Sequence, residues 1–316
     1  MTGFAQFCAA VITLFGLTAS QSQPLYTLVW HERPQPVGSV WTWSKQTVHR
    51  APVKINPDSL GVAVAAPTAI IIDAQSGATL WEKNPSDVRA IGSISKLMTA
   101  LVFLDHHPDW DSVVTIEAAD QAEDGRSNFL TGERVKVRDL LAASLIPSDN
   151  DATRALARVS GLSSENFVKA MNDKARTLGM TQSYFSEPTG LSAENVSTAR
   201  EVIRFAREAF AKPEISLLVG DKEYQFTSES GEVHQLKSTN KLFGSIIGIK
   251  QAKTGFIDQA GHCMVAKVED KGRTVFTAVL GAPSDADRFQ DTKMMSYWVF
   301  RNWRWPQEVD PPKLVL

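Results

Sequence analysis

Three short motifs place hydroxyl, amine and amide side chains where they could act together on one substrate. They are Ser-Ile-Ser-Lys at residues 93–96, Ser-Asp-Asn at residues 148–150 and Lys-Thr-Gly at residues 253–255. Patterns like the first two recur at residues 238–241 and 164–166, so neither is specific alone, whereas Lys-Thr-Gly occurs once. Each motif adjoins a predicted helix start, helix break or strand, from which side chains of different elements can converge.

Ser93 and Lys96 are the candidate nucleophile and base. Residues three apart on a helix are neighbours, so the Lys96 amine can lie beside the Ser93 hydroxyl. An alcohol is too weak an acid to attack a carbonyl unaided, and a lysine accepts its proton only when the lysine pKa is low. Burial lowers that pKa, and we expect Lys253, as a nearby cation, to lower it further. The helix start also offers exposed amides and a positive dipole end to an oxyanion.

The other two motifs supply groups that handle the substrate. Ser148 can relay the proton to a leaving amine, and Asn150 offers an amide that fixes either the substrate backbone or the amine of the first motif. Lys253 and Thr254 offer a cation and a hydroxyl to a substrate carboxylate. Gly255 has no side chain, so we expect an extended substrate to lie along this strand edge as an added strand.

Strands are predicted near both sequence ends. Residues 69–72 and 78–81 flank a Gln-Ser-Gly turn, and residues 263–268 and 274–280 flank Glu-Asp-Lys-Gly, so each pair predicts a β-hairpin. Lys253 is predicted to precede a strand.

Helices are predicted in the middle of the chain. The first buries Leu97, Leu101 and their helical neighbours and ends before Pro108. Residues 137–179 predict three helices broken at Pro147 and Gly161. Two more helices are expected at residues 197–211 and 285–303. This order predicts an α/β fold in which an antiparallel sheet built from both chain ends is flanked by helices and carries an inserted, mostly helical lobe.

Composition excludes several classes of protein. The 33 basic and 35 acidic residues give a net charge of -2 without long like-charge runs, so no nucleic-acid partner is expected. Neither Cys-x-x-Cys nor His-Glu-x-x-His occurs, so we expect no metal site, and no motif requires a cofactor. The 43% hydrophobic content is that of a globular protein with a large core.

The N-terminal residues resemble an export signal. An apolar stretch at residues 4–17 is followed by the small residues Thr18 and Ser20, which suits cleavage after Ser20. The first thirty residues contain no Lys or Arg, so an uncleaved anchor and a wrongly chosen start codon stay open as alternatives. The stretch is too short to span a bilayer comfortably.

The expected organisation follows from this signal and the motifs. We expect a signal peptide at residues 1–20, an unassigned segment at 21–62, a catalytic domain at 63–305 and a tail at 306–316. The protein is then exported to the periplasm or the outer face of the cytoplasmic membrane, with no stable transmembrane domain unless the N-terminal segment is retained.

The three motifs, in this order, resemble those of β-lactamases and penicillin-binding proteins. More narrowly, the chain resembles the serine D-Ala-D-Ala carboxypeptidases, which are low-molecular-mass penicillin-binding proteins with a β-lactamase-like fold. The similarity extends over about residues 66–303 and includes Ile-Asp-Ala at 72–74, Leu-Gly-Met at 178–180, Glu-Pro-Thr-Gly-Leu at 187–191 and Leu-Gly-Ala-Pro at 280–283.

This resemblance implies roles for particular residues. Ser93 would be the acylated nucleophile and Lys96 its base, with peptidoglycan stem peptides as substrates and β-lactam antibiotics as covalent inhibitors. The oxyanion hole would use the backbone amides of Ser93 and Phe256. Ser148 and Asn150 would be the second-motif residues, Lys253 the third-motif cation, and Arg288 the holder of the terminal carboxylate of D-alanine.

Two activities fit the resemblance. The chain stops soon after Trp305, and its Lys-Thr-Gly-Phe and Ala-Gly-His-Cys segments at 253–256 and 260–263 resemble the shorter DD-endopeptidases, which cut D-alanine cross-links. Arg288 favours a carboxypeptidase, because a bidentate carboxylate clamp suits a substrate that ends in free D-alanine. We therefore expect trimming of pentapeptide stems, with cross-link cutting as the alternative.

Two further functions stay open at this point. A β-lactamase would need a glutamate that activates water; Glu187 lies in a suitable loop, but its surroundings resemble the peptidase turn. A catalytically silent peptidoglycan-binding protein on the same scaffold would not need the intact side chains of the three motifs.

The clamp assignment gives a first prediction. Arg288→Ala is expected to raise KM for a peptide ending in D-Ala-D-Ala, because the terminal carboxylate loses its partner, and to spare acylation by simple esters, which have no such carboxylate. Steady-state kinetics on both substrate types measure this. Peptide kinetics that match the unaltered protein would remove the argument for a clamp.

Overall fold

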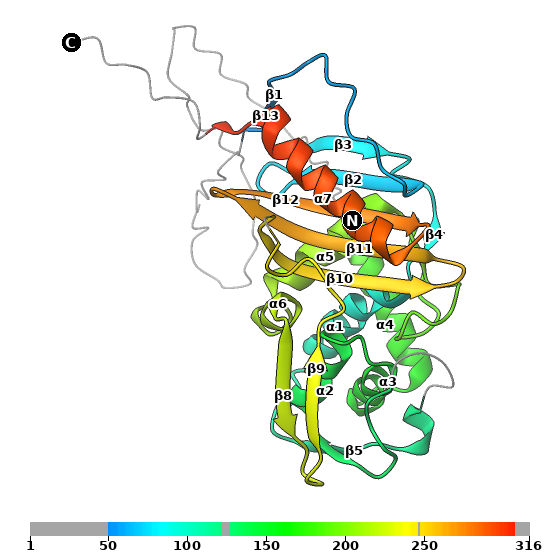
Figure 1. The fold of residues 1–316 in the computed structure, drawn as a ribbon. Coiled ribbons are helices and arrows are strands. Elements are labelled where there is room, and N and C mark those ends of the chain that lie inside the picture. Colours follow the sequence, from blue (N-terminus) through cyan, green and yellow to red (C-terminus); the bar gives the residue numbers. More distant parts are fainter. Residues whose placement is uncertain (1–49, 122–126, 246, 307–316) are drawn as a thin grey trace, which may run out of the picture. The chain divides into compact units, whose positions relative to one another are not determined.

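The computed structural model describes residues 50–121, 127–245 and 247–306 of the chain (Figure 1). The chain divides into residues 1–49 and residues 50–316, and the fold below is that of the second unit. The predicted export signal, most of the segment at 21–62 and nearly all of the predicted tail lie outside the described residues.

A five-stranded antiparallel sheet forms the centre of the fold. Its strand order is β10-β11-β12-β2-β3, so the central β12–β2 pair joins the two ends of the chain, as predicted. The strands are β2 (Thr68–Asp73), β3 (Thr79–Lys83), β10 (Ile249–Ile257), β11 (Gly261–Asp270) and β12 (Arg273–Ala282). Both predicted hairpins, β2–β3 and β11–β12, are confirmed.

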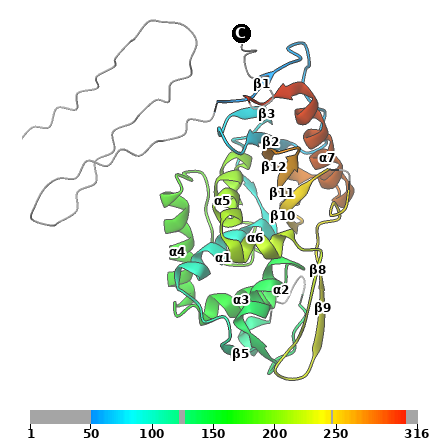
Figure 2. The same cartoon turned by 90° about the vertical axis from the view of Figure 1, so that its left-hand side faces the viewer.

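The alternation of apolar residues along the strands builds a core on each face of the sheet. Ile70 and Ile72 of β2 enter the larger core, and Ala69 and Ile71 enter the smaller one. This follows because successive side chains of a strand point to opposite faces. Helix α5 (Ala199–Ala211) covers one face and α7 (Asp285–Asn302) the other (Figure 2).

The helical lobe lies on the same side of the sheet as the larger core. Residues 137–179 form three helices as predicted, and Asp149 and Ser163 cap the second and third by accepting a backbone N–H, at 2.7 and 3.2 Å. The lobe helices are α1 (Lys96–Asp105), α2 (Val137–Leu145), α3 (Asn150–Val159), α4 (Ser164–Thr177) and α6 (Pro213–Gly220). Almost every residue of α1 is buried, so this helix is the centre of the lobe.

Four two-stranded pairs complete the fold, and the sequence patterns did not predict them. They are β1 (Val53–Lys54) with β13 (Trp303–Arg304), β4 (Arg89–Ala90) with β7 (Val196–Ser197), β5 (Val113–Thr115) with β6 (Arg134–Lys136), and β8 (Glu223–Thr227) with β9 (Val233–Lys237). The β1–β13 pair brings residues before the expected domain start at 63 into the fold. In the part of the chain that is described, no helix combines the length and apolarity that crossing a bilayer requires.

Trp305 anchors the C-terminal end of the described residues to the sheet. Its side chain is 1% exposed, and its indole N–H donates at 2.7 Å to Oδ1 of Asp73, the last residue of β2. The ring also packs on Phe300, with centroids 5.6 Å apart. This contact closes the smaller core at the end of the sheet.

Trp305→Ala is therefore expected to lower the free energy of unfolding by about 3–5 kcal/mol, because it empties a buried aromatic site. Chemical denaturation measures the loss. Tyr297→Ala is the matched control, since Tyr297 is 46% exposed on α7 and its removal is expected to change stability by about 0.5 kcal/mol or less. Similar losses in both variants would contradict this account of the chain end.

Candidate active site

Ser93 lies on a short 3₁₀ turn, Gly92–Ser95, immediately before α1. The sequence predicted a helix start here, and the α-helix itself begins three residues later, at Lys96. The Ser93 side chain is half-buried, whereas Lys96 is completely buried. The nucleophile candidate therefore faces an accessible space, and the base candidate lies in the interior behind it.

Three oxygen atoms surround the Lys96 amine. Its Nζ is 3.0 Å from Ser93 Oγ, 2.7 Å from Asn150 Oδ1 and 2.6 Å from the backbone oxygen of Thr189. A neutral amine has two N–H groups and one lone pair. When Asn150 and Thr189 accept the two N–H groups, the lone pair is left for the Ser93 hydroxyl. This is the arrangement that proton transfer from serine to lysine requires.

Burial lowers the pKa of Lys96 to about 7. Glu187 and Asp149 act against this shift with their negative charges, and Arg154 adds to it. The sequence singled out Lys253 as the cation with this effect, whereas Arg154 of α3 was missed. With a pKa near 7, a large share of the amine is neutral at physiological pH and can act as a base.

The second motif forms the sharp turn between α2 and α3. Ser148 has a φ of +68°, which is uncommon for a residue with a side chain, and the backbone then turns directly into α3. Asp149 caps the helix, and Asn150 is the first helical residue, which points its amide oxygen at Lys96. The strained turn thus places Ser148 and Asn150 on the same site.

The third motif brings the sheet to this site. Lys253 lies within β10, not before a strand as predicted, and its side chain is 1% exposed. Its Nζ donates to Ser148 Oγ at 2.7 Å. The three motifs are therefore joined by hydrogen bonds in two groups, one around Lys96 and one around Lys253 and Ser148.

Glycines allow β10 to lie directly against the Ser93 turn. A Cβ on Gly255 would collide with the backbone oxygen of Ile91, and a Cβ on Gly92 would lie 2.7 Å from the Phe256 nitrogen. The predicted reason for Gly255 was access for a substrate backbone. The structure adds a second reason, which is the close approach of the strand to the turn that carries the nucleophile, and the substrate contact stays a prediction.

Phe256 follows directly and stands at the end of β10. Its ring is 48% exposed and stacks on His262 of β11 with centroids 4.3 Å apart. The Phe256 backbone nitrogen lies close to Gly92, the residue before Ser93. The backbone amides of Phe256 and Ser93 therefore belong to two segments that are in contact. This is compatible with the expected oxyanion hole, whose role stays a prediction.

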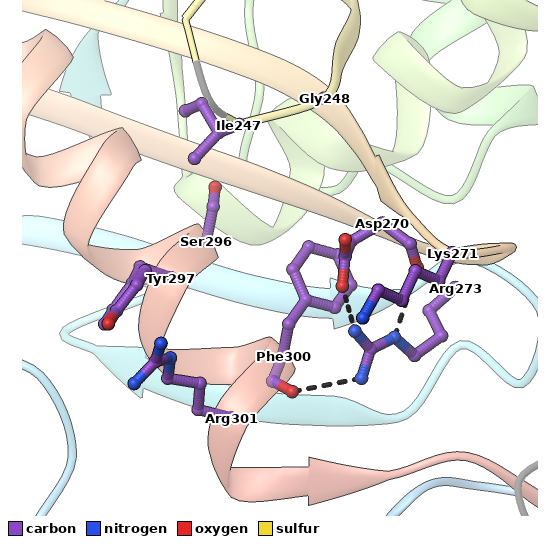
Figure 3. Close-up of a pocket in the computed structure, with 9 residues that line it drawn as sticks. All are labelled: Ile247, Gly248, Asp270, Lys271, Arg273, Ser296, Tyr297, Phe300 and Arg301. Carbon is purple, nitrogen blue, oxygen red and sulfur yellow. Dashed lines mark hydrogen bonds and ion pairs between the residues drawn. The ribbon is translucent and has the colours of Figure 1, made fainter.

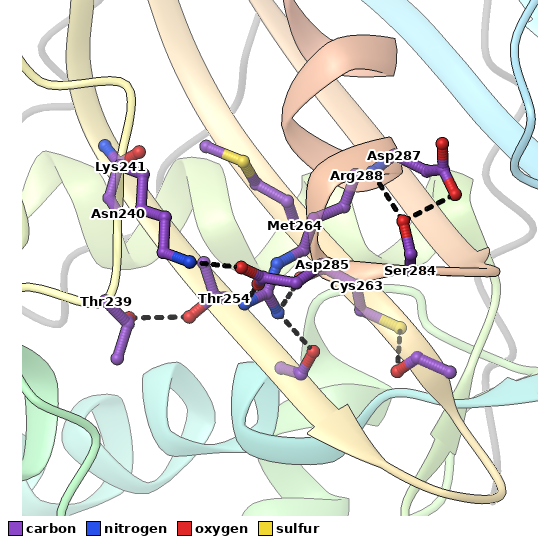
Figure 4. A network of polar contacts seen from close by, with 12 residues as sticks. Thr239, Asn240, Lys241, Thr254, Cys263, Met264, Ser284, Asp285, Asp287 and Arg288 are labelled. Carbon is purple, nitrogen blue, oxygen red and sulfur yellow. Dashed lines mark hydrogen bonds and ion pairs between the residues drawn. The ribbon is translucent and has the colours of Figure 1, made fainter.

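Thr254 and Arg288 belong to a second group of polar residues, in which Arg288 bonds to Gly255, the residue after Thr254 (Figure 4). The Thr254 and Thr239 hydroxyls are 2.6 Å apart. Arg288 is 7% exposed, and its Nη1 donates to the Gly255 backbone oxygen at 2.9 Å. Its Nη2 pairs with Asp285, which also pairs with Lys241. Both terminal nitrogens of Arg288 thus already have protein partners.

A separate cavity of about 440 Å³ lies at the β11–β12 turn, beside the second half of α7 (Figure 3). Arg273 in its wall pairs with Asp270 and donates to the Phe300 backbone oxygen at 3.0 Å. Ser296 Oγ donates to the Thr292 backbone oxygen at 2.7 Å. The cavity is at the opposite end of β11 from Phe256 and His262, so it is not part of the catalytic centre.

Among the described residues, no cluster of three or more His, Cys, Asp or Glu side chains could hold a metal ion. Cys263 is fully buried, and burial raises the pKa of its thiol to about 11, so the thiol is a poor nucleophile.

The pKa of Lys96 predicts the pH dependence of acylation. The neutral amine is the base, so the rate of Ser93 acylation by an activated ester or a penicillin is expected to fall about tenfold per pH unit below pH 7 and to level off above it. Stopped-flow acylation rates between pH 5 and pH 9 measure this.

Lys96→Ala is expected to reduce the plateau rate by about 10²–10⁴-fold. Lys83→Ala serves as the control. Lys83 is the last residue of β3, and its amine donates to the backbone oxygens of Val64 and Ala66. A pH–rate profile whose acid limb has its midpoint near pH 10 would contradict the role of Lys96, and so would equal acylation rates in the two variants.

Comparisons with known proteins show which family the chain belongs to. The family model for D-alanyl-D-alanine carboxypeptidases matches residues 53–284. A D-alanyl-D-alanine endopeptidase of Pseudomonas aeruginosa is 33% identical over 252 residues, which cover 75% of this chain and 77% of that protein. A D-alanyl-D-alanine carboxypeptidase of Bacillus subtilis is 30% identical, covering 75% of this chain and 62% of that protein.

Solved structures of DD-peptidases have a fold similar to that of this chain. The Streptomyces K15 DD-transpeptidase matches with a TM-score of 0.73 and 28% identity, covering 77% of this chain and 100% of that one. The match of the family model and the similarity to these relatives show that the chain belongs to the D-alanyl-D-alanine carboxypeptidase family of serine peptidases and has the penicillin-binding-protein fold.

Proposed function

We propose that this protein is a serine DD-peptidase that breaks D-alanyl bonds in peptidoglycan stem peptides through an acyl-enzyme on Ser93. The observation that carries the proposal is the buried Lys96 amine, which lies 3.0 Å from Ser93 Oγ and has a pKa lowered to about 7. Such substrates lie outside the cytoplasmic membrane, so the proposal includes export to the periplasm or the outer membrane face.

The reaction starts with attack by the Ser93 hydroxyl on the carbonyl of the D-alanine that donates its acyl group. Lys96 takes the serine proton, and the backbone amides of Ser93 and Phe256 stabilise the oxyanion. The carbon–nitrogen bond then breaks, and the leaving amine takes a proton from Ser148, which regains one from protonated Lys96, so that Ser148 relays the Ser93 proton and Lys96 is neutral again. Lys253, which donates to Ser148 Oγ at 2.7 Å, favours this step by holding the hydroxyl in place. Water finally hydrolyses the ester and regenerates Ser93.

The substrate backbone would add to the sheet at β10. This strand is an edge of the five-stranded sheet, and an edge strand has backbone groups available for an extended peptide. Thr254 and Lys253 lie on β10, so the same edge that binds the backbone also presents a hydroxyl and a cation to the substrate.

For the finer activity, we favour cutting of D-alanine cross-links. The expectation of a carboxypeptidase, and of a raised KM in Arg288→Ala, rested on a free Arg288, but its terminal nitrogens already donate to the Gly255 oxygen and to Asp285, so Asp285 competes with a free carboxylate for the guanidinium. Relatives from Pseudomonas aeruginosa and Escherichia coli are named endopeptidases, at 33% and 32% identity. Trimming of terminal D-alanine is the second candidate, since Arg288 bonds to Gly255 of β10, the residue after Thr254.

An intact-mass measurement after incubation with a penicillin tests the acyl-enzyme. We expect a long-lived adduct that maps to Ser93 and disappears in Ser93→Ala, because the ester on Ser93 is hydrolysed slowly when the β-lactam product cannot leave. Ser95→Ala, two residues away on the same turn, is the control and is expected to keep the adduct. Rapid loss of the adduct would select a β-lactamase, and no adduct would select a binding protein without catalysis.

Digestion of purified muropeptides then separates the two peptidase activities. Cross-linked dimers are expected to yield monomers faster than pentapeptide monomers lose D-alanine, because the engaged Arg288 gives a free terminus little advantage. Liquid chromatography with mass detection measures both rates in one mixture. Faster loss of D-alanine from monomers would select the carboxypeptidase.

A further inference from the structure

The loop that follows Phe185 touches both members of the catalytic pair. The Thr189 backbone oxygen accepts a hydrogen bond from Lys96 Nζ at 2.6 Å. Gly190 has a φ of +84°, and a Cβ there would collide with the Gly92 backbone oxygen, so the loop lies directly against the turn that carries Ser93. The conformation of this loop therefore sets the surroundings of both the base and the nucleophile.

Glu187 holds this loop together. Its carboxylate accepts hydrogen bonds from Thr189 N and Oγ1, each at 2.6 Å, and from the backbone nitrogen of Gly190 at 2.5 Å. Longer bonds come from Ser192 N at 3.4 Å and Asn195 Nδ2 at 3.1 Å. A carboxylate has about four acceptor sites, so Glu187 uses its full capacity on the loop.

The charge of Glu187 also acts on the base. Three charged groups shift the pKa of the Lys96 amine, and a fourth lies across the site. Glu187 and Asp149 are negative, Arg154 of α3 is positive, and Lys253 of β10 is bonded to Ser148 across the site. Of the two carboxylates, Glu187 has the larger effect on the pKa of Lys96, and it raises that pKa. Proton transfer from Ser93 creates an ammonium ion in a buried place, where a nearby negative charge stabilises it.

We propose that Glu187 is a positioning residue of this site, which folds the 187–190 turn so that Thr189 presents its oxygen to Lys96 and which stabilises the ammonium formed during acylation. The proposal rests on the proposed function, in which Lys96 is the base for Ser93. It differs from the water-activating role of a β-lactamase glutamate, because here the carboxylate oxygens are bonded to the loop itself.

The test compares acylation rates by a penicillin, from pH 5 to pH 9, in Glu187→Gln and in Glu201→Gln. Glu201 is a matched control, because its carboxylate also accepts hydrogen bonds from a neighbouring loop, namely from Thr181 N, Gln182 N and Ser183 Oγ. Glu201 is not among the charges that shift the pKa of Lys96. Circular dichroism and thermal unfolding check that both variants fold.

Glu187→Gln is expected to lower the plateau rate about tenfold or more and to move the midpoint of the acid limb about one pH unit lower. The sign follows because loss of the negative charge disfavours protonated Lys96. Glu201→Gln is expected to keep the midpoint. Glu187→Asp, which keeps the charge but shortens its reach, is expected to lose rate with a midpoint near that of the unaltered protein.

A Glu187→Gln midpoint that does not move would overturn the proposal, even if the rate falls, since a purely structural role predicts that result. Equal midpoint shifts in Glu187→Asp and Glu187→Gln would overturn it as well. If the Gln variant does not fold, a midpoint about one pH unit lower in Glu187→Asp overturns the proposal by itself, because that variant keeps the negative charge. Ser93→Ala in the same assay tests the proposed function separately. Persistent acylation without Ser93 would refute that function, whatever the Glu187 variants do.

Discussion

The removal of one lysine amine from water is the constraint on which the rest of the site depends. The pKa of Lys96 falls from 10.5 to about 7, which corresponds to about 5 kcal/mol between its two protonation states. The fold keeps this amine inside by giving it oxygen partners from three separate segments: Ser93 on the 3₁₀ turn, Asn150 on α3 and Thr189 in the loop before α5. Each segment must therefore be held in place independently.

Different devices hold these segments. The Asp149 cap fixes the start of α3, and the Glu187 carboxylate fixes the loop that presents Thr189. Close contact of backbone with backbone fixes the Ser93 turn, where Gly92, Gly190 and Gly255 leave no room for a side chain. The site thus forms at the junction of the sheet edge and the helical lobe, and either part alone would lack half of it.

Much of the fold was predictable from residue patterns. Alternating or continuous apolar runs identified the β2–β3 and β11–β12 hairpins, and three- and four-residue spacing identified α1 to α5 and α7. The β8–β9 hairpin escaped prediction because it is half-exposed, with only residues such as Phe226 and Leu236 facing the lobe. Most of its remaining positions are polar, so the apolar pattern is short. Lys253 was placed before a strand because polar residues interrupt the apolar pattern in β10.

The site was predictable to a similar extent. Spacing alone suggested that Ser93 and Lys96 meet, and the contacts of Lys96 with Asn150 and of Lys253 with Ser148 agree with the expected convergence. The influence of Arg154 and Glu187 on the base depends on three-dimensional packing. The same holds for the partners of Arg288, because Asp285 is a helix-start residue with several possible roles. An acidic residue just before Pro-Thr-Gly in a polar loop was the one available signal for Glu187.

Direct titration of the Lys96 side chain tests the central claim. With ¹³C-labelled lysine, the Cε resonance of Lys96 can be followed by NMR from pH 5 to pH 11 and assigned by its absence in Lys96→Arg. The account predicts a midpoint near 7. A midpoint near 10.5, the value of a solvated lysine, would show that the amine is protonated throughout the physiological range and cannot serve as the base for Ser93.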